Sequence, residues 1–368
     1  MASGQTVMYW QVYRYREQAH SYRSCPRYVR GQAITYVAQA SSTTQLNDLR
    51  IHSPLLPSSP APVTRNAPSM RSLCAVLCGL ILSVVLAGCI ATPIPLTQQT
   101  RERLSQQAPI RFVVTFDDGP SASSLANPTI QVLHSLAQNP VQNDIKAVFF
   151  VQTGATRAGN SDRGRRIMRR EAAAGHILGF HSGTPGHTNH RTLSDEVLEQ
   201  SLQQGSAIIA STMGSPPTLL RPPFWNYDQR TFAAYQRHGM QVLLTDISAN
   251  DGKIWGFNAS PRRRAHMLRE MSEVRERVAS GEFHAVDGAI PIVVTFHDLN
   301  RYTARHTREY LQILLDSAQT TGLQVAPKPF YDDRAELQRA ALSRTVPTSA
   351  VAVHLPGVWG WVWDNDSR

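Results

Sequence analysis

From residue 110 onward the chain alternates short apolar runs rich in β-branched residues with longer stretches of helical periodicity, and this alternation most limits its possible folds. The apolar runs predict six strands, at 110–116, 146–151, 176–180, 217–221, 240–246 and 290–296. Several helical patterns between them end in glycine, as helices often do. These patterns cover 129–138, 162–175, 194–214 and 229–239. Strands that alternate with helices favour a mostly parallel sheet, either doubly wound or closed as a β/α barrel.

Polar side chains stand where most of these predicted strands end. Asp117 and Asp118 follow the first strand, and the later ends carry His181, Arg221, Asp246, and His297 with Asp298. Because the carboxyl ends of parallel strands meet in one crevice, we expect these carboxylates, imidazoles and the guanidinium to form a catalytic site.

The stretch "TFDDGPS" (115–121) places two carboxylates side by side at a strand end. Adjacent strand residues point in different directions, so one carboxylate can bind a metal ion while the other acts as a base. The Gly-Pro pair that follows predicts a turn that keeps the loop clear of the site.

The stretch "FHSGTPGHTNH" (180–190) offers three histidines, His181, His187 and His190. All four cysteines precede residue 90, so the remainder of the chain has no thiolate ligand or cysteine nucleophile. A carboxylate with two imidazoles suits a catalytic zinc-like ion that keeps open coordination positions. His181 follows a strand directly and is the firmest of the three candidates.

Two further stretches supply other catalytic groups. In "LLRPPFWNYD", Arg221 can pair with a carboxylate and fix its direction, and Phe224 is the first residue after two prolines with an N–H that can stabilise an oxyanion. Trp225 and Tyr227 offer flat faces on which a sugar ring could stack, although core packing explains them equally well. In "IVVTFHDLN", His297 suits a general acid.

These motifs, in this order, resemble those of the polysaccharide deacetylase family, the carbohydrate esterases with a NodB homology domain. The resemblance spans residues 110–325 and rests on "TFDDGPS", "EAAAGHILGFHS", "RPPFWNYD" and "VVTFHD". It implies a distorted (β/α) barrel with fewer than eight repeats and a divalent metal, Zn²⁺ ahead of Co²⁺, Ni²⁺ or Mn²⁺. It also implies hydrolysis of acetyl groups from N-acetylated or O-acetylated sugars.

The resemblance assigns a role to each matching residue. Asp117 becomes the general base, Asp118 and His181 become metal ligands, Arg221 orients Asp117, the Phe224 N–H stabilises the oxyanion, and His297 becomes the general acid.

Two motifs depart from the family pattern. The ligand histidines of the family are four positions apart, whereas here the partner of His181 lies six or nine positions later. His190 is favoured because "RTLS" after it resembles the family sequence after the second ligand, which leaves His187 near the metal or facing substrate. The acid that orients His297 or Arg221 is Asp246 or Asp251, of which Asp246 is favoured.

The segment "MRSLCAVLCGLILSVVLAGC" (70–89) predicts a secretory signal peptide, because a basic start precedes an apolar run too short to span a membrane. Its end, Leu86 to Cys89, resembles a bacterial lipobox and implies lipidation of Cys89. Residues 1–69 are expected to be absent from the native protein, which would start at Met70, or to be disordered.

The predicted order after the signal peptide is a tether (90–109), a catalytic domain (110–330) and a C-terminal extension (331–368) with Trp359, Trp361 and Trp363. Those tryptophans suit an edge strand packed on the barrel, or a surface for sugar or membrane.

Most of the positive charge lies near the start of the sequence. The formal net charge is +10, and residues 1–71 carry eight arginines against Glu17 and Asp48. The catalytic region therefore has an ordinary charge, and nucleic-acid binding has little support. No protein partner is indicated. The sequence predicts a lipid-anchored enzyme of the bacterial cell envelope, facing the periplasm or the surface and favouring the outer membrane, with an acetylated glycan as substrate. The alternative is an inactive glycan-binding lipoprotein on the same fold.

Overall fold

The central strand β1 (Ile110–Asp117) is buried along its whole length, as its continuous apolar sequence predicts. In the computed structural model, which describes residues 95–251 and 263–348, β1 pairs in parallel with its neighbour β7 (Ile290–His297). The register runs from Ile110 opposite Ile290 to Asp117 opposite His297. The carboxyl ends of these two strands therefore place Asp117 and His297 side by side.

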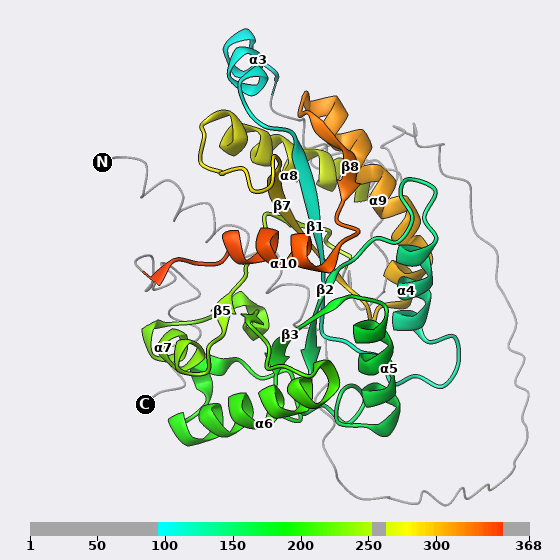
Figure 1. The fold of residues 1–368 in the computed structure, drawn as a ribbon, viewed down its shortest axis with the longest axis vertical. Coiled ribbons are helices and arrows are strands. Elements are labelled where there is room, and N and C mark those ends of the chain that lie inside the picture. The colour runs from blue at the N-terminus through cyan, green and yellow to red at the C-terminus, as the bar shows by residue number, and fades with distance from the viewer. Residues whose placement is uncertain (1–94, 252–262, 349–368) are drawn as a thin grey trace, which may run out of the picture. The chain divides into compact units, whose positions relative to one another are not determined.

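The strands follow one another around a curved path (Figure 1). The strand order is β5-β4-β3-β2-β1-β7-β6, and every pairing in it is parallel. Strand β8 also pairs with β1 but is not part of this order. Because β7 lies next to β1, this is the cyclic order of a barrel that is open between β5 and β6. The predicted distorted (β/α) barrel with fewer than eight repeats is confirmed. The remaining strands are β2 (Val148–Gln152), β3 (Ile177–Ser182), β4 (Leu219–Leu220), β5 (Gln241–Val242), β6 (Ile247–Ser248) and β8 (Val325–Phe330).

Helices pack against one another in series outside the strands (Figure 1). The contacts run from α8 through α9, α4, α5 and α6 to α7, which is the outer ring expected of a β/α barrel. The helices predicted at 129–138, 162–175, 194–214 and 229–239 are confirmed as α4 to α7. The bounds are α3 (Gln98–Ser105), α4 (Pro128–Ala137), α5 (Asp162–Ala173), α6 (Asp195–Met213), α7 (Gln229–Arg237), α8 (Arg263–Ala279), α9 (Arg301–Thr321) and α10 (Arg334–Ser343).

The interior of the barrel is filled by a small apolar cluster below the catalytic edge. Alternate residues of a strand point to opposite faces, so Val113 shares a face with Thr115 and Asp117. Val113 packs with Val148, Val293 and residues of α10 such as Leu337, and α10 contacts both β1 and β7. This packing closes the barrel at the end opposite Asp117.

The prediction of a strand at 240–246 is wrong for the second half of that range. Only Gln241–Val242 form β5, after which the chain crosses the opening of the barrel. The Leu243 N–H donates to Leu220 O, whereas the Asp246 N–H donates to Val293 O on β7. The apolar run therefore links two strands that do not pair with each other, a role that its composition does not distinguish from a strand. Strand β8, whose sequence contains two prolines, was not predicted.

Several sequence-based predictions lie outside the described residues. These are the segment 1–69, the signal peptide with Cys89, the first part of the tether, and the tail with Trp359, Trp361 and Trp363. Within the described ranges, none of the helices combines the length and the apolar composition needed to cross a bilayer.

Candidate active site

The two adjacent carboxylates at the end of β1 have different partners. Asp117 is 2% exposed and accepts hydrogen bonds from Arg221 Nη1 at 2.8 Å and Trp225 Nε1 at 3.2 Å. Asp118 has a φ of 72°, which turns its side chain out of the strand direction and toward two histidines. The division of labour predicted from "TFDDGPS" therefore has a structural basis.

Three ligand atoms converge on one point beside Asp118. Asp118 Oδ1 lies 3.1 Å from His181 Nε2 and 3.1 Å from His187 Nε2, and the two nitrogens are 3.0 Å apart. His181 Nδ1 lies 2.7 Å from the carbonyl oxygen of Arg221. Because a carbonyl only accepts, Nδ1 carries the proton and Nε2 presents its lone pair to the cluster.

This donor set fits a divalent metal ion. One carboxylate oxygen and two imidazole nitrogens match the ligand types of a catalytic zinc site, and the three atoms lie within 4.8 Å of one another. Burial lowers the pKa of His187 to about 4 despite the opposing charge of Asp118, so the ring is neutral at pH 7, as a ligand must be. Burial acts to raise the pKa of Asp118, but the neighbouring His187 and His181 side chains hold it well below its usual range.

The preference for His190 over His187 is corrected by this arrangement. The chain between β3 and His187 folds back on itself, because Thr184 Oγ1 donates to Gly186 O at 2.7 Å and returns His187 to the strand end. His190 instead begins the short 3₁₀ helix η1 (His190–Thr192), is fully buried, and has Nδ1 2.9 Å from Tyr235 Oη. Burial lowers its pKa to about 3.

Arg221 fills the barrel above the small cluster and holds Asp117 from below. It is fully buried, and its guanidinium lies over the Phe150 ring at 4.3 Å. Besides Asp117, its hydrogen-bond acceptors are Thr115 Oγ1, Thr295 Oγ1 and the carbonyl oxygens of Leu243 and Leu244. A planar donor bound at several points fixes the direction of the Asp117 carboxylate, as predicted.

The backbone after the two prolines is strained. Phe224 and Trp225 have φ values of 59° and 55°, in the left-handed region that disfavours bulky residues. This conformation directs the Phe224 ring against His187, with centroids 4.4 Å apart, and the Trp225 indole to Asp117. The oxyanion role of the Phe224 N–H stays a prediction.

The proposed sugar-stacking faces are not available at the surface. Trp225 is 4% exposed and Tyr227 is 9% exposed, and both pack in the main core. Of the two readings of these aromatic residues, core packing is therefore the one that the structure supports. Trp225 has a polar role in addition, through its hydrogen bond to Asp117.

His297 is held by Asp251 and not by the favoured Asp246. Asp251 Oδ1 lies 2.8 Å from His297 Nδ1, and Oδ2 accepts from the His297 backbone N–H at 2.7 Å. Asp246 points away, where it accepts from Arg277 and Arg344 and from the Val293 N–H. The reason is the path of the chain after β5, where it crosses the opening of the barrel. Asp246 meets β7 at Val293, before the strand ends, and Asp251 reaches the end of β7 at His297.

The sequence comparison decides the family. Residues 106–243 match the polysaccharide deacetylase family, and this range contains Asp117, Asp118, His181, His187 and Arg221. Residues 106–243 therefore form a polysaccharide deacetylase domain.

Known relatives of the deacetylase domain come from bacteria and fungi. A peptidoglycan-N-acetylglucosamine deacetylase of Listeria monocytogenes is 30% identical over 237 residues, which cover 64% of this chain and 42% of the relative. A chitin deacetylase of a Pestalotiopsis species is 29% identical over 143 residues, or 39% of this chain and 44% of the relative. The chain thus spans less than half the length of these relatives.

Among solved structures, a family 4 carbohydrate esterase from Streptomyces lividans is 20% identical to this chain. The likeness covers 60% of this chain and 95% of the esterase, with a TM-score of 0.41.

Two polar groups of the deacetylase domain had no predicted role: Gln152 was missed, and Asp298 was noted only for its place at a strand end. Gln152 ends β2 and donates from Nε2 to Asp118 Oδ1 at 3.1 Å. Asp298 follows His297 and accepts from Thr129 Oγ1 at 2.5 Å. Gln152 also stands at a strand end, so the rule that found the other residues applies to it too.

Proposed function

We propose that this protein is a metal-dependent hydrolase that removes acetyl groups from N-acetylated sugars of a glycan. The observation that carries the proposal is the convergence of Asp118, His181 and His187 beside an Asp117 carboxylate that Arg221 and Trp225 hold. The similarity to a peptidoglycan-N-acetylglucosamine deacetylase and to a chitin deacetylase supports a polymer of N-acetylglucosamine as substrate.

Asp118, His181 and His187 would hold the metal ion, for which we propose Zn²⁺. A bound divalent ion supplies Lewis-acid polarisation of the acetyl carbonyl and makes water more acidic. Asp117 would take the proton from the attacking water, and its carboxylate is kept in place by donors on both oxygens.

His297 would give a proton to the departing amine. Burial acts to lower the pKa of His297, but the charge and hydrogen bond of Asp251, with the charges of Asp118 and Asp117, raise it to about 10. The ring is therefore protonated at neutral pH. Its Nδ1 faces Asp251, which leaves Nε2 to pass the proton.

We also propose that the protein is a lipoprotein anchored through Cys89 and faces the periplasm or the cell surface. The sequence "LAGC" at the end of an apolar run supports this proposal. Mass spectrometry of the native protein, isolated from membranes, would detect the lipid on an N-terminal cysteine. An unmodified cysteine would refute the anchor.

The test of the activity is acetate release from chitin oligosaccharides and peptidoglycan, with metal removed by a chelator and then restored. We expect release that depends on metal and is lost in Asp117→Asn, which should still bind the metal. Metal content should fall in His187→Ala and persist in His190→Ala if the fold is kept. A metal-loaded protein that binds acetylated glycans but releases no acetate would be the inactive glycan-binding protein instead.

A further inference from the structure

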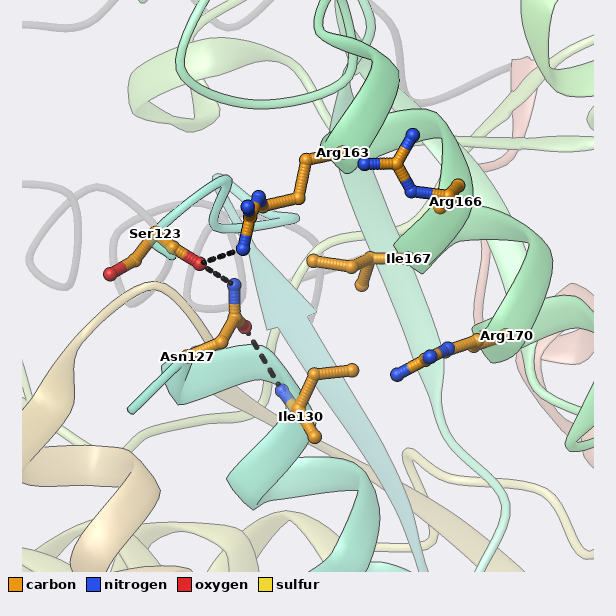
Figure 2. A pocket seen from close by; sticks show the side chains of 7 residues that line it. All are labelled: Ser123, Asn127, Ile130, Arg163, Arg166, Ile167 and Arg170. Carbon is orange, nitrogen blue, oxygen red and sulfur yellow. Dashed lines mark hydrogen bonds between the residues drawn. The ribbon is translucent and has the colours of Figure 1, made fainter. Parts of the chain in front are cut away.

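A pocket rich in arginine opens between α4 and α5, apart from the catalytic groups. Its volume is about 220 Å³. Arginine side chains and Ile167 of α5 line one side, as Figure 2 shows. The opposite side comes from the start of α4 and the loop before it. The lining residues are Ser123, Asn127, Ile130, Arg163, Arg166, Ile167 and Arg170.

The positive charge of this pocket is not neutralised by the residues that line it, none of which is acidic. Arg163 donates only a long hydrogen bond, 3.5 Å, to the Ser123 carbonyl oxygen. Among the described residues, the side chains of Arg166 and Arg170 have no ion-pair or hydrogen-bond partner. Both residues are exposed. In Figure 2, Arg170 extends from α5 toward Ile130, and Arg166 lies on the same side nearer to Arg163.

The two acidic residues of α5 do not offset these arginines. Asp162 is paired with Arg165, with 2.8 Å between Oδ1 and Nη2. Glu171 is fully buried, and burial together with the nearby Asp298 raises its pKa well above the usual value. The α5 face that lines the pocket therefore carries net positive charge.

The other polar groups of the pocket are already engaged within their own loop. Asn127 Nδ2 donates to the carbonyl oxygens of Ser121 and Ser123, and its Oδ1 accepts from the Ile130 N–H. A ligand would therefore be bound by guanidinium groups, with Ile130 and Ile167 as an apolar surface between them. Guanidinium groups bind phosphate and carboxylate in pairs of parallel hydrogen bonds.

The pocket lies on the side of the barrel where substrate would arrive. The loop that contains Ser123 and Asn127 begins directly after Asp117 and Asp118, and α4 and α5 follow the carboxyl ends of β1 and β2. In β/α folds these connections surround the active-site opening. Because the pocket is concave, it suits a single anionic group better than it suits the flat surface of a membrane.

We propose that the pocket between α4 and α5 binds a phosphate or carboxylate group carried by the glycan that the enzyme acts on. The identity of the ligand as a glycan rests on the proposed deacetylase function, whereas the anion site itself does not. Such a site would favour acetylated glycans with anionic substituents over neutral ones.

Calorimetric titration measures this binding without any catalytic turnover. The probes are inorganic phosphate, N-acetylglucosamine 6-phosphate and N-acetylglucosamine, each titrated into the full chain. The pocket variant is Arg166→Gln with Arg170→Gln. The matched control, Arg165→Gln with Arg169→Gln, removes the same charge from the same helix outside the lining.

We expect both phosphate probes to bind the wild type and the control, and to bind the pocket variant at least tenfold more weakly. Loss of two charge-assisted contacts is enough for this effect. N-acetylglucosamine without phosphate should bind all three proteins equally. Circular dichroism should show that both variants are folded, because all four arginines lie on the outer part of α5.

Two results would overturn the proposal. One is equal phosphate affinity in the pocket variant and the control. The other result combines two measurements. The wild type and the control would sediment with anionic phospholipid vesicles and the pocket variant would not, while the pocket variant would bind N-acetylglucosamine 6-phosphate with the affinity of the wild type. Phosphate binding that follows the pattern expected above would support the anion site even if no glycan released acetate, so the two proposals can fail separately.

Discussion

Replacing Asp251 with asparagine would remove one negative charge beside His297 and keep the size of the side chain. Asp251 now has one oxygen 2.8 Å from His297 Nδ1 and the other 2.7 Å from the His297 backbone nitrogen. The second oxygen also accepts from Thr303 Oγ1 at 2.6 Å. An asparagine that keeps its oxygen toward Nδ1 turns its amide nitrogen toward the backbone N–H, which is itself a donor.

The expected size of the effect follows from these distances. A unit charge about 4 Å away contributes roughly 4 kcal/mol at the effective dielectric of protein sites, or about 3 pKa units. Without that charge, the pKa of His297 should fall from about 10 to about 7. The proton donor would then be depleted above neutral pH, and we expect kcat/KM to fall about 10²-fold to 10³-fold.

The same change should alter how stability depends on pH. The pKa of His297 is raised in the folded state, so its charge adds stability that is complete below pH 6.5 and lost as pH rises to about 10. That contribution is on the order of 5 kcal/mol. The free energy of unfolding of the wild type should therefore decline between pH 7 and 10, and that of Asp251→Asn should be lower at pH 7 and decline less.

Three measurements check this reasoning: an NMR titration of His297, urea unfolding at pH 7 and at pH 10, and acetate release across pH. Asp316→Asn is the matched control, because Asp316 is half-exposed on α9 and bonded to Gln312 and Arg264. The control should behave like the wild type. An unchanged His297 titration together with an unchanged kcat/KM in Asp251→Asn would refute the role given to Asp251.

Three other substitutions test the groups around Asp117. Gly119→Ala should destabilise the fold by about 1–3 kcal/mol in thermal unfolding, because a Cβ there would lie 2.2 Å from the Asp298 carboxylate oxygens; stability like that of the wild type would contradict the close approach. Trp225→Phe keeps the ring in the core and removes its hydrogen bond to Asp117, so kcat/KM for acetate release should drop about tenfold with metal content unchanged. Arg221→Lys keeps the positive charge but removes the several donors of the guanidinium group. We expect the free energy of unfolding in urea to fall by about 3–5 kcal/mol. An unchanged free energy would mean that other bonds of the network replace those of Arg221.

The fold was predictable from the sequence because it depends on simple periodicity. Buried parallel strands such as Ile110–Asp117 read as continuous apolar runs, and the helices between them have polar outer faces. The rule that polar residues at strand ends meet in one crevice located Asp117, Asp118, His181, Arg221 and His297 correctly. These positions require only that the strands be parallel and in register.

The errors fall where the chain leaves the strands. The choice between His187 and His190 depended on a loop whose path is set by the hydrogen bond between Thr184 and Gly186. The choice between Asp246 and Asp251 depended on how the chain crosses the open side of the barrel. Neither path follows from periodicity, because each is decided by contacts between residues far apart in the sequence or by a few local bonds.

The left-handed backbone at Phe224 and Trp225 positions side chains of the site but lowers the stability of the fold. Each such residue costs on the order of 1–3 kcal/mol, and glycine at the same position avoids most of that cost. Phe224→Gly would therefore relax the backbone while it removes the ring that packs on His187. Directed evolution for thermal tolerance alone should accumulate such changes at the expense of the proposed activity, so a screen for stable variants of this protein has to measure both properties.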